Sequence, residues 1–229
     1  MLFIVDFDGT VAPTDTVDAL LERFADPAWR RVEEQWVAGQ LNSRECMKDQ
    51  LSLVTAERET VKDFLQSVAI DPFFAGFVRY ASTFAEVAVV SDGLDYPIHH
   101  ALQKLDIPPI PVYANRLKFR AHGLDITFPH TNATCMPRSG VCKCAVARSL
   151  NADRGLSTVL IGDGRSDRCL AQSADYVFAK GALRGYCEDK GITYTPFDSF
   201  NDILAVVEKW DPALFNKAPR EKPCHLAAQ

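Results

Sequence analysis

The chain has 229 residues, of which 47% are hydrophobic, and it carries a formal net charge of -5 at pH 7. This length and apolar content allow one full-sized domain, or one core domain with a modest insert, and argue against two equal domains. The acidic balance gives no long-range attraction to nucleic-acid phosphates or anionic lipid. We therefore expect a small molecule as the partner, and neither nucleic acid nor a membrane.

The amino-terminal apolar run is short. It covers residues 2–5 and leads directly into an aspartate, which fits neither a signal peptide nor a membrane span. We expect a cytoplasmic protein, in which the seven cysteines are reduced thiols rather than a disulfide framework.

Buried strands are predicted by four short apolar runs, at residues 2–5, 86–90, 158–161 and 176–178. Between the first two runs, residues 15–83 show repeated helical periodicity and no strand pattern. A further helix is predicted at residues 96–105, and short strands at 112–113, 117–120 and 124–128, the last two joined as a hairpin. This alternation predicts an α/β fold with a doubly wound parallel sheet.

The domain organisation follows from that fold, because ligands bind beyond the carboxyl ends of the strands. We expect a core domain formed by residues 1–12 and 84–210, with a helical cap at 13–83 inserted over the ligand site. Residues 211–229 contain several prolines and basic residues without apolar periodicity, which predicts a flexible tail.

The first chemical motif, Asp6-Phe7-Asp8-Gly9-Thr10, follows the first predicted strand directly. Side chains alternate along a strand, so Asp6 and Asp8 can face one pocket. One carboxylate could attack phosphorus while the other transfers protons. Gly9 permits a tight turn, and the Thr10 hydroxyl can donate to a phosphoryl oxygen. The plain alternative is a turn that is merely rich in turn-forming residues.

A second acidic motif, residues 162–167 with the sequence Gly-Asp-Gly-Arg-Ser-Asp, lies at the end of another predicted strand. Four carboxylates and a phosphate could not share one pocket without a cation, and a hard cation with oxygen ligands is Mg²⁺. We expect Asp163 to be a direct ligand and Asp167 to orient the site or pair with a lysine. A capped turn before a helix is the alternative.

Two further segments offer groups that can bind a phosphate. Ser91 follows the second strand, and the loop after it, Asp92-Gly93, can supply backbone donors. Lys143 begins a predicted helix and could stabilise charge on a transferring group. Taken alone, each is also explained as an ordinary turn or a solvated lysine.

The order of these motifs resembles the four motifs of the haloacid dehalogenase (HAD) superfamily, over residues 1–12 and 84–210. The resemblance implies that Asp6 is the nucleophile and that Asp8 is the general acid and base. It also implies a Mg²⁺ site formed by Asp6, Asp163 and the backbone carbonyl of Asp8, with Asp167 in support. Substrate binding is then expected from Thr10, Ser91, Asp92, Gly93 and Lys143. The acid two residues after the nucleophile is typical of phosphatases, so the expected reaction is phosphomonoester hydrolysis through an aspartyl-phosphate.

The helical insert resembles the cap of the phosphoserine phosphatase-like branch, subfamily IB. Asp15 and Lys48 stand where phosphoserine phosphatases place a glutamate and an arginine for the substrate amine and carboxylate. A closer resemblance, through residues 129–144, 178–180 and 196–200, is to methionine-salvage phosphatases that act on 2-hydroxy-3-keto-5-methylthiopentenyl-1-phosphate, which implies that substrate. The alternatives are a phosphoserine phosphatase-like hydrolase and a non-catalytic phosphate-binding module.

A cysteine-rich segment precedes Lys143. His130, Cys135, Cys142 and Cys144 are residue types that bind zinc, but their spacing lacks a CxxC pair. Reduced structural thiols are the alternative explanation. The sequence gives no prediction of oligomeric state.

Overall fold

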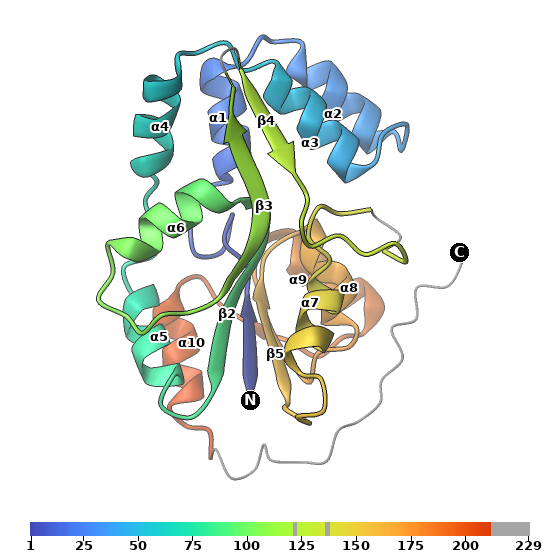
Figure 1. The fold of residues 1–229 in the computed structure, drawn as a ribbon. Coiled ribbons are helices and arrows are strands. Elements are labelled where there is room, and N and C mark those ends of the chain that lie inside the picture. The colour runs from blue at the N-terminus through green and yellow to red at the C-terminus, as the bar shows by residue number, and fades with distance from the viewer. Residues whose placement is uncertain (121–122, 136–137, 212–229) are drawn as a thin grey trace.

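The computed structural model describes residues 1–120, 123–135 and 138–211 (Figure 1). Within them, one seven-stranded sheet has the order β4-β3-β2-β1-β5-β6-β7. Its strands are β1 (Leu2–Val5), β2 (Glu86–Leu94), β3 (Val112–Phe119), β4 (Leu124–Thr127), β5 (Thr158–Gly162), β6 (Tyr176–Ala179) and β7 (Thr195–Pro196). All neighbouring pairs are parallel except β3 and β4. The predicted α/β fold with a doubly wound, mainly parallel sheet is confirmed.

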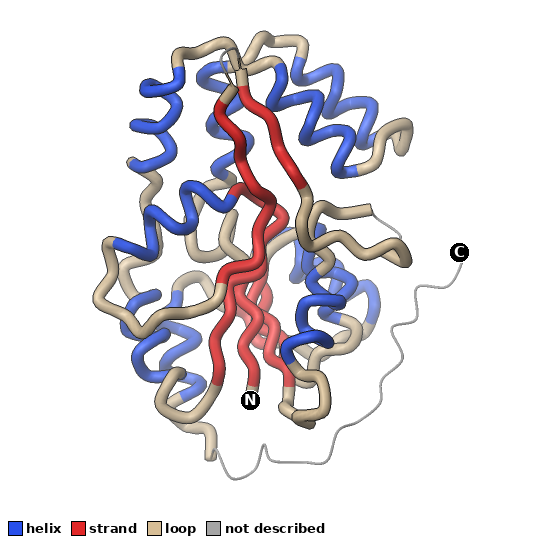
Figure 2. Tube along the Cα trace, in the orientation of Figure 1, coloured by secondary structure: helices blue, strands red, loops and turns tan. Residues whose placement is uncertain are grey.

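Helices cover both faces of the sheet (Figures 1 and 2). On one face lie α5 (Phe74–Ala81), α6 (Asp95–Gln103) and α10 (Phe200–Val207), and on the other lie α7 (Lys143–Leu150), α8 (Arg168–Ala171) and α9 (Gly181–Lys190). The central strand β1 shows why: Phe3 belongs to the first apolar cluster and Ile4 to the second. A strand buried on both faces needs apolar side chains in both directions, which explains the continuous run that predicted it.

A third apolar cluster lies beyond one end of the sheet, between the helices α1 (Thr16–Phe24), α2 (Trp29–Val37), α3 (Ser43–Ser52) and α4 (Arg58–Gln66). The β3–β4 hairpin extends into this region, so Leu117 and Ile126 pack with Leu20, Leu51 and Leu65 (Figures 1 and 2). The cap is therefore packed on a hairpin whose sequence comes from the core segment. The expected boundaries of the cap, residues 13–83, stay a prediction.

Helix α5 falls within those expected boundaries, yet it packs on the sheet. Phe77 is fully buried, with ring centroids 5.4 Å from Phe3 and 5.2 Å from Phe200. Phe74 packs against the same helix α10, with its ring 4.9 Å from Phe200. These contacts make α5 part of the main core, and α1 to α4 are the helices that pack over the hairpin.

The structure differs from the sequence prediction at β3, which is one continuous strand where two were expected. Asn115 interrupts the apolar pattern, but it is completely buried and held by hydrogen bonds. The hairpin pairing predicted with β4 is confirmed as antiparallel, while residues 121–122 of its turn lie outside the described residues. The predicted tail also lies outside them, apart from residue 211.

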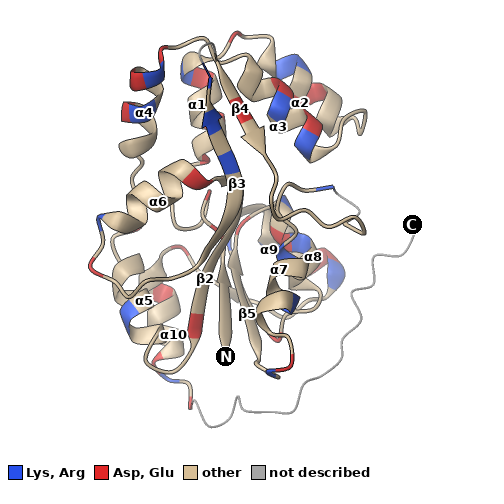
Figure 3. Ribbon diagram, in the orientation of Figure 1, with Lys and Arg blue, Asp and Glu red and all other residues tan. Residues whose placement is uncertain are grey.

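Many of the charged residues lie on helices, among them α2, α3 and α4, and a few lie on the strands (Figure 3). Arg116 and Lys118 on β3 are exposed, which agrees with a solvated strand face. In the part of the chain that the structure describes, no helix has both the length and the apolar character needed to span a bilayer.

Replacing Phe77 by alanine should lower the free energy of unfolding by about 3–5 kcal/mol, because the change leaves a cavity between α5, β1 and α10. Phe73, also a phenylalanine and 47% exposed at the start of α5, provides the matched control. We expect about 1 kcal/mol or less for Phe73→Ala. Denaturant unfolding measures the free energy of unfolding of both variants. Equal losses of stability would contradict the assignment of α5 to the main core.

Candidate active site

The strand order brings together the carboxyl ends of β1, β2 and β5, and one of the predicted motifs lies at each of these ends. β1 lies between β2 and β5, so the segments after β1 and β5 meet the end of β2 at one edge of the sheet. Asp6 is fixed at this edge by its backbone, because its N–H donates to the carbonyl of Ile161 at 2.9 Å. The convergence expected at the carboxyl ends of parallel strands is therefore present.

A buried lysine joins two of the predicted motifs. Lys143 Nζ lies 2.6 Å from Asp6 Oδ2 and 2.5 Å from Asp167 Oδ1, and it donates to Ser166 Oγ at 2.9 Å. The Lys143 side chain is only 1% exposed. Burial opposes its charge, but Asp167 and Asp6 outweigh burial and the pKa of Lys143 is raised above its ordinary value. This lysine therefore carries a positive charge at the centre of the site.

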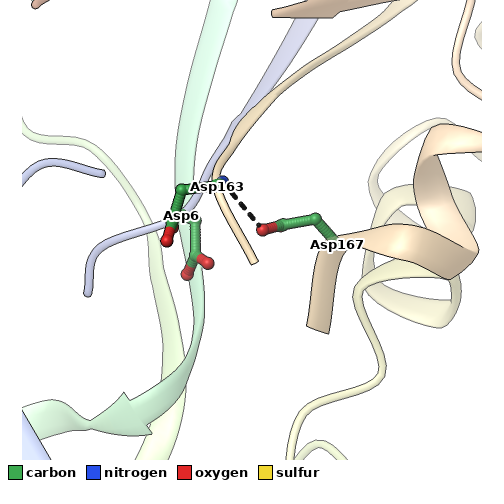
Figure 4. A group of neighbouring side chains, drawn as sticks. All are labelled: Asp6, Asp163 and Asp167. Atoms are coloured by element: carbon green, nitrogen blue, oxygen red, sulfur yellow. Dashed lines mark hydrogen bonds between the residues drawn. The ribbon is translucent and has the colours of Figure 1, made fainter. Parts of the chain in front are cut away.

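Three carboxylates surround that charge. Oxygens of Asp6, Asp163 and Asp167 lie within 4.8 Å of one another, the one such acidic group that could hold a metal among the described residues (Figure 4). Burial, followed by the negative charge of Asp167, raises the pKa of Asp6 well above its usual range and also raises that of Asp163. A divalent cation would relieve this repulsion, and carboxylate oxygens are suitable ligands for Mg²⁺.

The three acids are not equally available to a cation. Asp167 uses Oδ1 on Lys143, and its Oδ2 accepts from the backbone N–H groups of Asp163 at 3.2 Å and Gly164 at 3.1 Å. Asp163 Oδ1 accepts from Thr10 Oγ1 at 2.8 Å. Asp167 therefore orients the loop, whereas Asp6 and Asp163 line the cavity, where they can face a ligand.

Asp8 lies in a separate polar group on the cap side. Its Oδ1 accepts from Thr16 N at 2.9 Å and Thr16 Oγ1 at 2.5 Å, and its Oδ2 accepts from Ser91 Oγ at 3.4 Å. Burial, reinforced by the charge of Asp15, raises the pKa of Asp8 to about 7. A carboxyl group with this pKa can exist in both protonation states near neutral pH, as a general acid and base requires.

The Ser91 turn is organised internally. Gly93 N donates to Ser91 Oγ at 2.9 Å, and a Cβ atom at Gly93 would lie 1.9 Å from Asp8 Oδ2. Asp92 Oδ1 accepts from Val141 N at 2.8 Å and from Asn115 Nδ2 at 3.2 Å. Ser91 and Gly93 therefore shape the surroundings of Asp8, while the Asp92 side chain bonds with the segment before Lys143.

A cavity of about 250 Å³ lies between these residues and the cap. From the core it is lined by Asp6, Asp8, Ser91, Asp92, Gly93, Asp163 and Ser166, and from the cap by Asp15, Val17, Asp18, Glu33, Trp36, Cys46, Met47 and Gln50. Arg165 connects the two sides, with its guanidinium carbon 4.7 Å from the centre of the Trp36 ring. The cavity is large enough for a small metabolite and is walled by both parts of the chain.

The predicted site residues converge, but their positions differ in detail. Thr10 and Lys143 are buried behind the carboxylates and do not line the cavity, although Lys143 touches Asp6. Sequence reasoning missed Thr16, which begins α1, and Ser166, whose place within the second acidic motif was an available signal. Asn115 gave no signal, because only the folded strand brings it beside Asp92.

The zinc alternative is not supported by the described residues. His130 and the three cysteines proposed with it do not form a group whose ligand atoms all lie close together. His130 instead packs its ring 5.1 Å from that of Tyr113, and its carbonyl accepts from Cys142 N at 3.1 Å. A thiol contact joins Cys144 and Cys169, whose Sγ atoms are 3.0 Å apart.

Comparison with known proteins identifies the family. The profile of haloacid dehalogenase-like hydrolases matches residues 3–172, which include all four motifs. The chain belongs to this family. The superfamily resemblance predicted from the motifs is thus confirmed.

Two curated relatives extend the match along most of the chain. Both are named 2-hydroxy-3-keto-5-methylthiopentenyl-1-phosphate phosphatase. The one from Exiguobacterium sibiricum is 35% identical over 206 residues, which cover 88% of this chain and 93% of the relative. The one from Exiguobacterium sp. is 33% identical over 211 residues, which cover 90% of this chain and 96% of the relative.

Solved structures support the fold. A phosphoserine phosphatase determined as a phospho-aspartyl intermediate analogue superimposes with a TM-score of 0.66 at 19% identity, covering 90% of this chain and 97% of that chain. A substrate-bound phosphoserine phosphatase complex gives a TM-score of 0.65 at the same identity and coverage. At this identity the likeness concerns the HAD fold.

Gly9 offers a test of how closely the two acidic motifs must approach. A Cβ atom at Gly9 would lie 2.3 Å from Asp163 Oδ2, whereas a Cβ at Gly39 would meet nothing within 4 Å. Both glycines have a positive φ, 70° and 75°, so alanine introduces similar backbone strain at each. Gly9→Ala should weaken Mg²⁺ binding by about tenfold or more, because Asp163 must move.

Gly39→Ala is the matched control for that change and should bind Mg²⁺ like the wild type. Isothermal titration calorimetry measures both dissociation constants. Equal Mg²⁺ affinities in the two variants would contradict a cation site that depends on the position of Asp163.

Proposed function

We propose that the protein is a Mg²⁺-dependent phosphomonoester hydrolase that works through an aspartyl-phosphate on Asp6. The observation that carries this proposal is the placement of Asp6 at the end of β1, paired with Lys143 at 2.6 Å and beside Asp163. A carboxylate held by a buried cation at the end of a cavity is placed for attack on a bound phosphoryl group.

The first half-reaction transfers the phosphoryl group to Asp6. A carboxylate oxygen of Asp6 forms a bond to phosphorus while the ester P–O bond breaks, and Asp8 donates its proton to the departing oxygen. The raised pKa of Asp8, about 7, makes the protonated form available for this step. Lys143 and the Ser166 hydroxyl lie on the Asp6 side of the phosphoryl group, where they stabilise its negative charge.

The second half-reaction regenerates the enzyme. Asp8, now deprotonated, accepts a proton from water as the water oxygen attacks phosphorus, and the bond to Asp6 breaks to release inorganic phosphate. Thr16 holds the Asp8 carboxylate in place during both steps through two hydrogen bonds. One acid thus serves both transfers, because each step returns it to the state that the other needs.

A Mg²⁺ ion would be held by Asp6, Asp163 and the backbone carbonyl of Asp8. When bound, it supplies positive charge to the phosphoryl oxygens and relieves the repulsion among the carboxylates. Asp167 supports this set from behind, because Lys143 and two backbone N–H groups already engage its oxygens.

For the substrate we propose 2-hydroxy-3-keto-5-methylthiopentenyl-1-phosphate, the compound named for the curated relatives. Val17, Trp36 and Met47 give the cavity an apolar wall that suits a methylthio group. Hydroxyl groups of the substrate could donate to the acidic side chains of the cap.

Phosphoserine fits the cavity less well. Lys48, at the position expected to face a substrate carboxylate, is exposed and does not line the cavity. Among the described residues that line the cavity, Arg165 is the only basic one, and its guanidinium stacks on Trp36. A substrate carboxylate would instead face Asp15, Asp18 and Glu33. A cytoplasmic location and the absence of a nucleic-acid partner remain predictions.

Asp6→Asn should abolish phosphate release from any substrate while retaining Mg²⁺-assisted phosphate binding, because the amide keeps the shape but is not a nucleophile. Asp71→Asn is a matched control: Asp71 is also buried, but its carboxylate accepts from the backbone N–H groups of Phe73 and Phe200, away from the cavity. Phosphate release assays with and without Mg²⁺ test both variants. Turnover by Asp6→Asn at the wild-type rate would rule out the covalent mechanism.

Substrate choice is tested by comparing kcat/KM for the methylthiopentenyl phosphate, phosphoserine and a generic aryl phosphate. The first should be preferred over phosphoserine by about 100-fold or more, because Asp15, Asp18 and Glu33 would repel a substrate carboxylate while the guanidinium of Arg165 stacks on Trp36. Preference for phosphoserine would contradict the substrate proposal while leaving the phosphatase mechanism intact. The absence of release from every ester would contradict both.

A further inference from the structure

The position of Lys143 depends on the four residues that precede it, 139–142. Helix α7 begins at Lys143, and its N-cap Cys142 makes no side-chain capping hydrogen bond. The segment is instead fixed through its backbone, by Cys142 N donating to His130 O at 3.1 Å and Val141 N donating to Asp92 Oδ1 at 2.8 Å. These bonds set where the first turn of α7, and therefore the Lys143 ammonium, lies.

Asp92 is itself fixed from the opposite side by Asn115. Asn115 Nδ2 donates to the Asp92 carbonyl at 2.6 Å and to Asp92 Oδ1 at 3.2 Å. Asn115 is completely buried, and its own Oδ1 makes no hydrogen bond to the described residues. A buried amide with one unused oxygen is costly, so the bonds from its nitrogen must hold it in this orientation.

Gly140 fits against the same asparagine. A Cβ atom at residue 140 would lie 2.3 Å from Asn115 Oδ1 and 2.6 Å from a ring carbon of Phe128. The segment before Lys143 therefore packs directly on the Asp92–Asn115 pair. One side chain from β2, Asp92, thus joins the strand that carries Ser91 to the segment that carries Lys143.

We propose that Asp92 is a positioning residue: its Oδ1, oriented by Asn115, holds Val141 and so aligns Lys143 with Asp6. This inference rests on the proposed role of Lys143 in binding the phosphoryl group. It changes the role expected for Asp92 from the sequence, because its side chain accepts hydrogen bonds from Asn115 and from the backbone of Val141 and Gly140. The proposal requires a hydrogen-bond acceptor at residue 92 and assigns no role to its negative charge.

That distinction separates two substitutions. Asparagine at residue 92 retains an Oδ1 that can accept from Val141 N and Asn115 Nδ2, whereas alanine removes the acceptor. Asp92→Ala should weaken binding of inorganic phosphate in the presence of Mg²⁺ by about tenfold, and Asp92→Asn should remain within about threefold of the wild type. Titration calorimetry on the full chain measures each dissociation constant.

Asp95→Ala is the matched control. Asp95 Oδ1 accepts from the backbone N–H of Leu117 at 2.9 Å, the same kind of bond from a nearby residue, but it touches neither Lys143 nor the segment before it. This variant should bind phosphate like the wild type. A loss equal to that of Asp92→Ala would mean that the effect reflects general loosening of the fold, and would overturn the proposal.

A positioning residue must act through the group that it positions. In a Lys143→Ala background, the further change Asp92→Ala should alter phosphate affinity by less than about twofold, because Asp92 acts on phosphate only by positioning the Lys143 ammonium. A full tenfold effect in that background would overturn the proposal. So would Asp92→Asn binding as weakly as Asp92→Ala, since the charge would then be essential.

Asn115→Ala provides a second variant if Asp92→Ala does not fold. It leaves Asp92 Oδ1 in place but removes the bonds that orient it, so phosphate affinity should fall by about threefold or more. Unchanged affinity would overturn the role given to the pair. The wild-type chain is measured first: if it binds no phosphate and releases none, the proposed function fails, whereas normal wild-type binding with unaffected variants rejects only the role of Asp92.

Discussion

The contact on which the site depends is the buried ion triad of Asp6, Lys143 and Asp167. Lys143 Nζ lies within 2.6 Å of one carboxylate and 2.5 Å of the other, with almost no solvent to screen the charges. Removing one member of such a group costs about 3–5 kcal/mol, because it leaves a buried charge without a partner. The triad holds three chain segments in register: the turn after β1, the start of α7 and the loop after β5. Asp6, Asp163 and Asp167 outnumber the single ammonium of Lys143, so the net negative charge favours a cation, and the positive charge of Lys143 favours a phosphoryl group.

Much of this arrangement could be predicted from the sequence because its parts are local. The apolar run at residues 2–5 must be a strand buried on both faces, and acids placed immediately after such strands must meet at one sheet edge. The pairing of Asp167 with a lysine was one of two roles expected for it, and the structure contains that pair.

The remaining features depend on contacts between distant residues, which periodicity does not encode. The helical pattern of α5 resembles those of α1 to α4, and only the packing of Phe77 against Phe3 and Phe200 assigns it to the sheet. Asn115 interrupts the apolar pattern of its strand because it bonds to Asp92, a contact between residues 23 positions apart in the chain. The stacking of Arg165 on Trp36 likewise joins a core loop to the cap. Each of these features depends on a contact between distant segments, whereas the chemistry of each motif could be predicted from neighbouring residues.

The proposed mechanism requires a covalent bond between phosphorus and Asp6. It is tested most directly by quenching the enzyme during turnover, reducing the acyl phosphate with borohydride and locating the product by mass spectrometry of the peptide that contains residue 6. We expect Asp6 to be converted to homoserine only when Mg²⁺ and substrate are both present, and Asp8 to be unchanged. Turnover with no reduced residue at position 6, or with reduction at Asp8 instead, would contradict this mechanism.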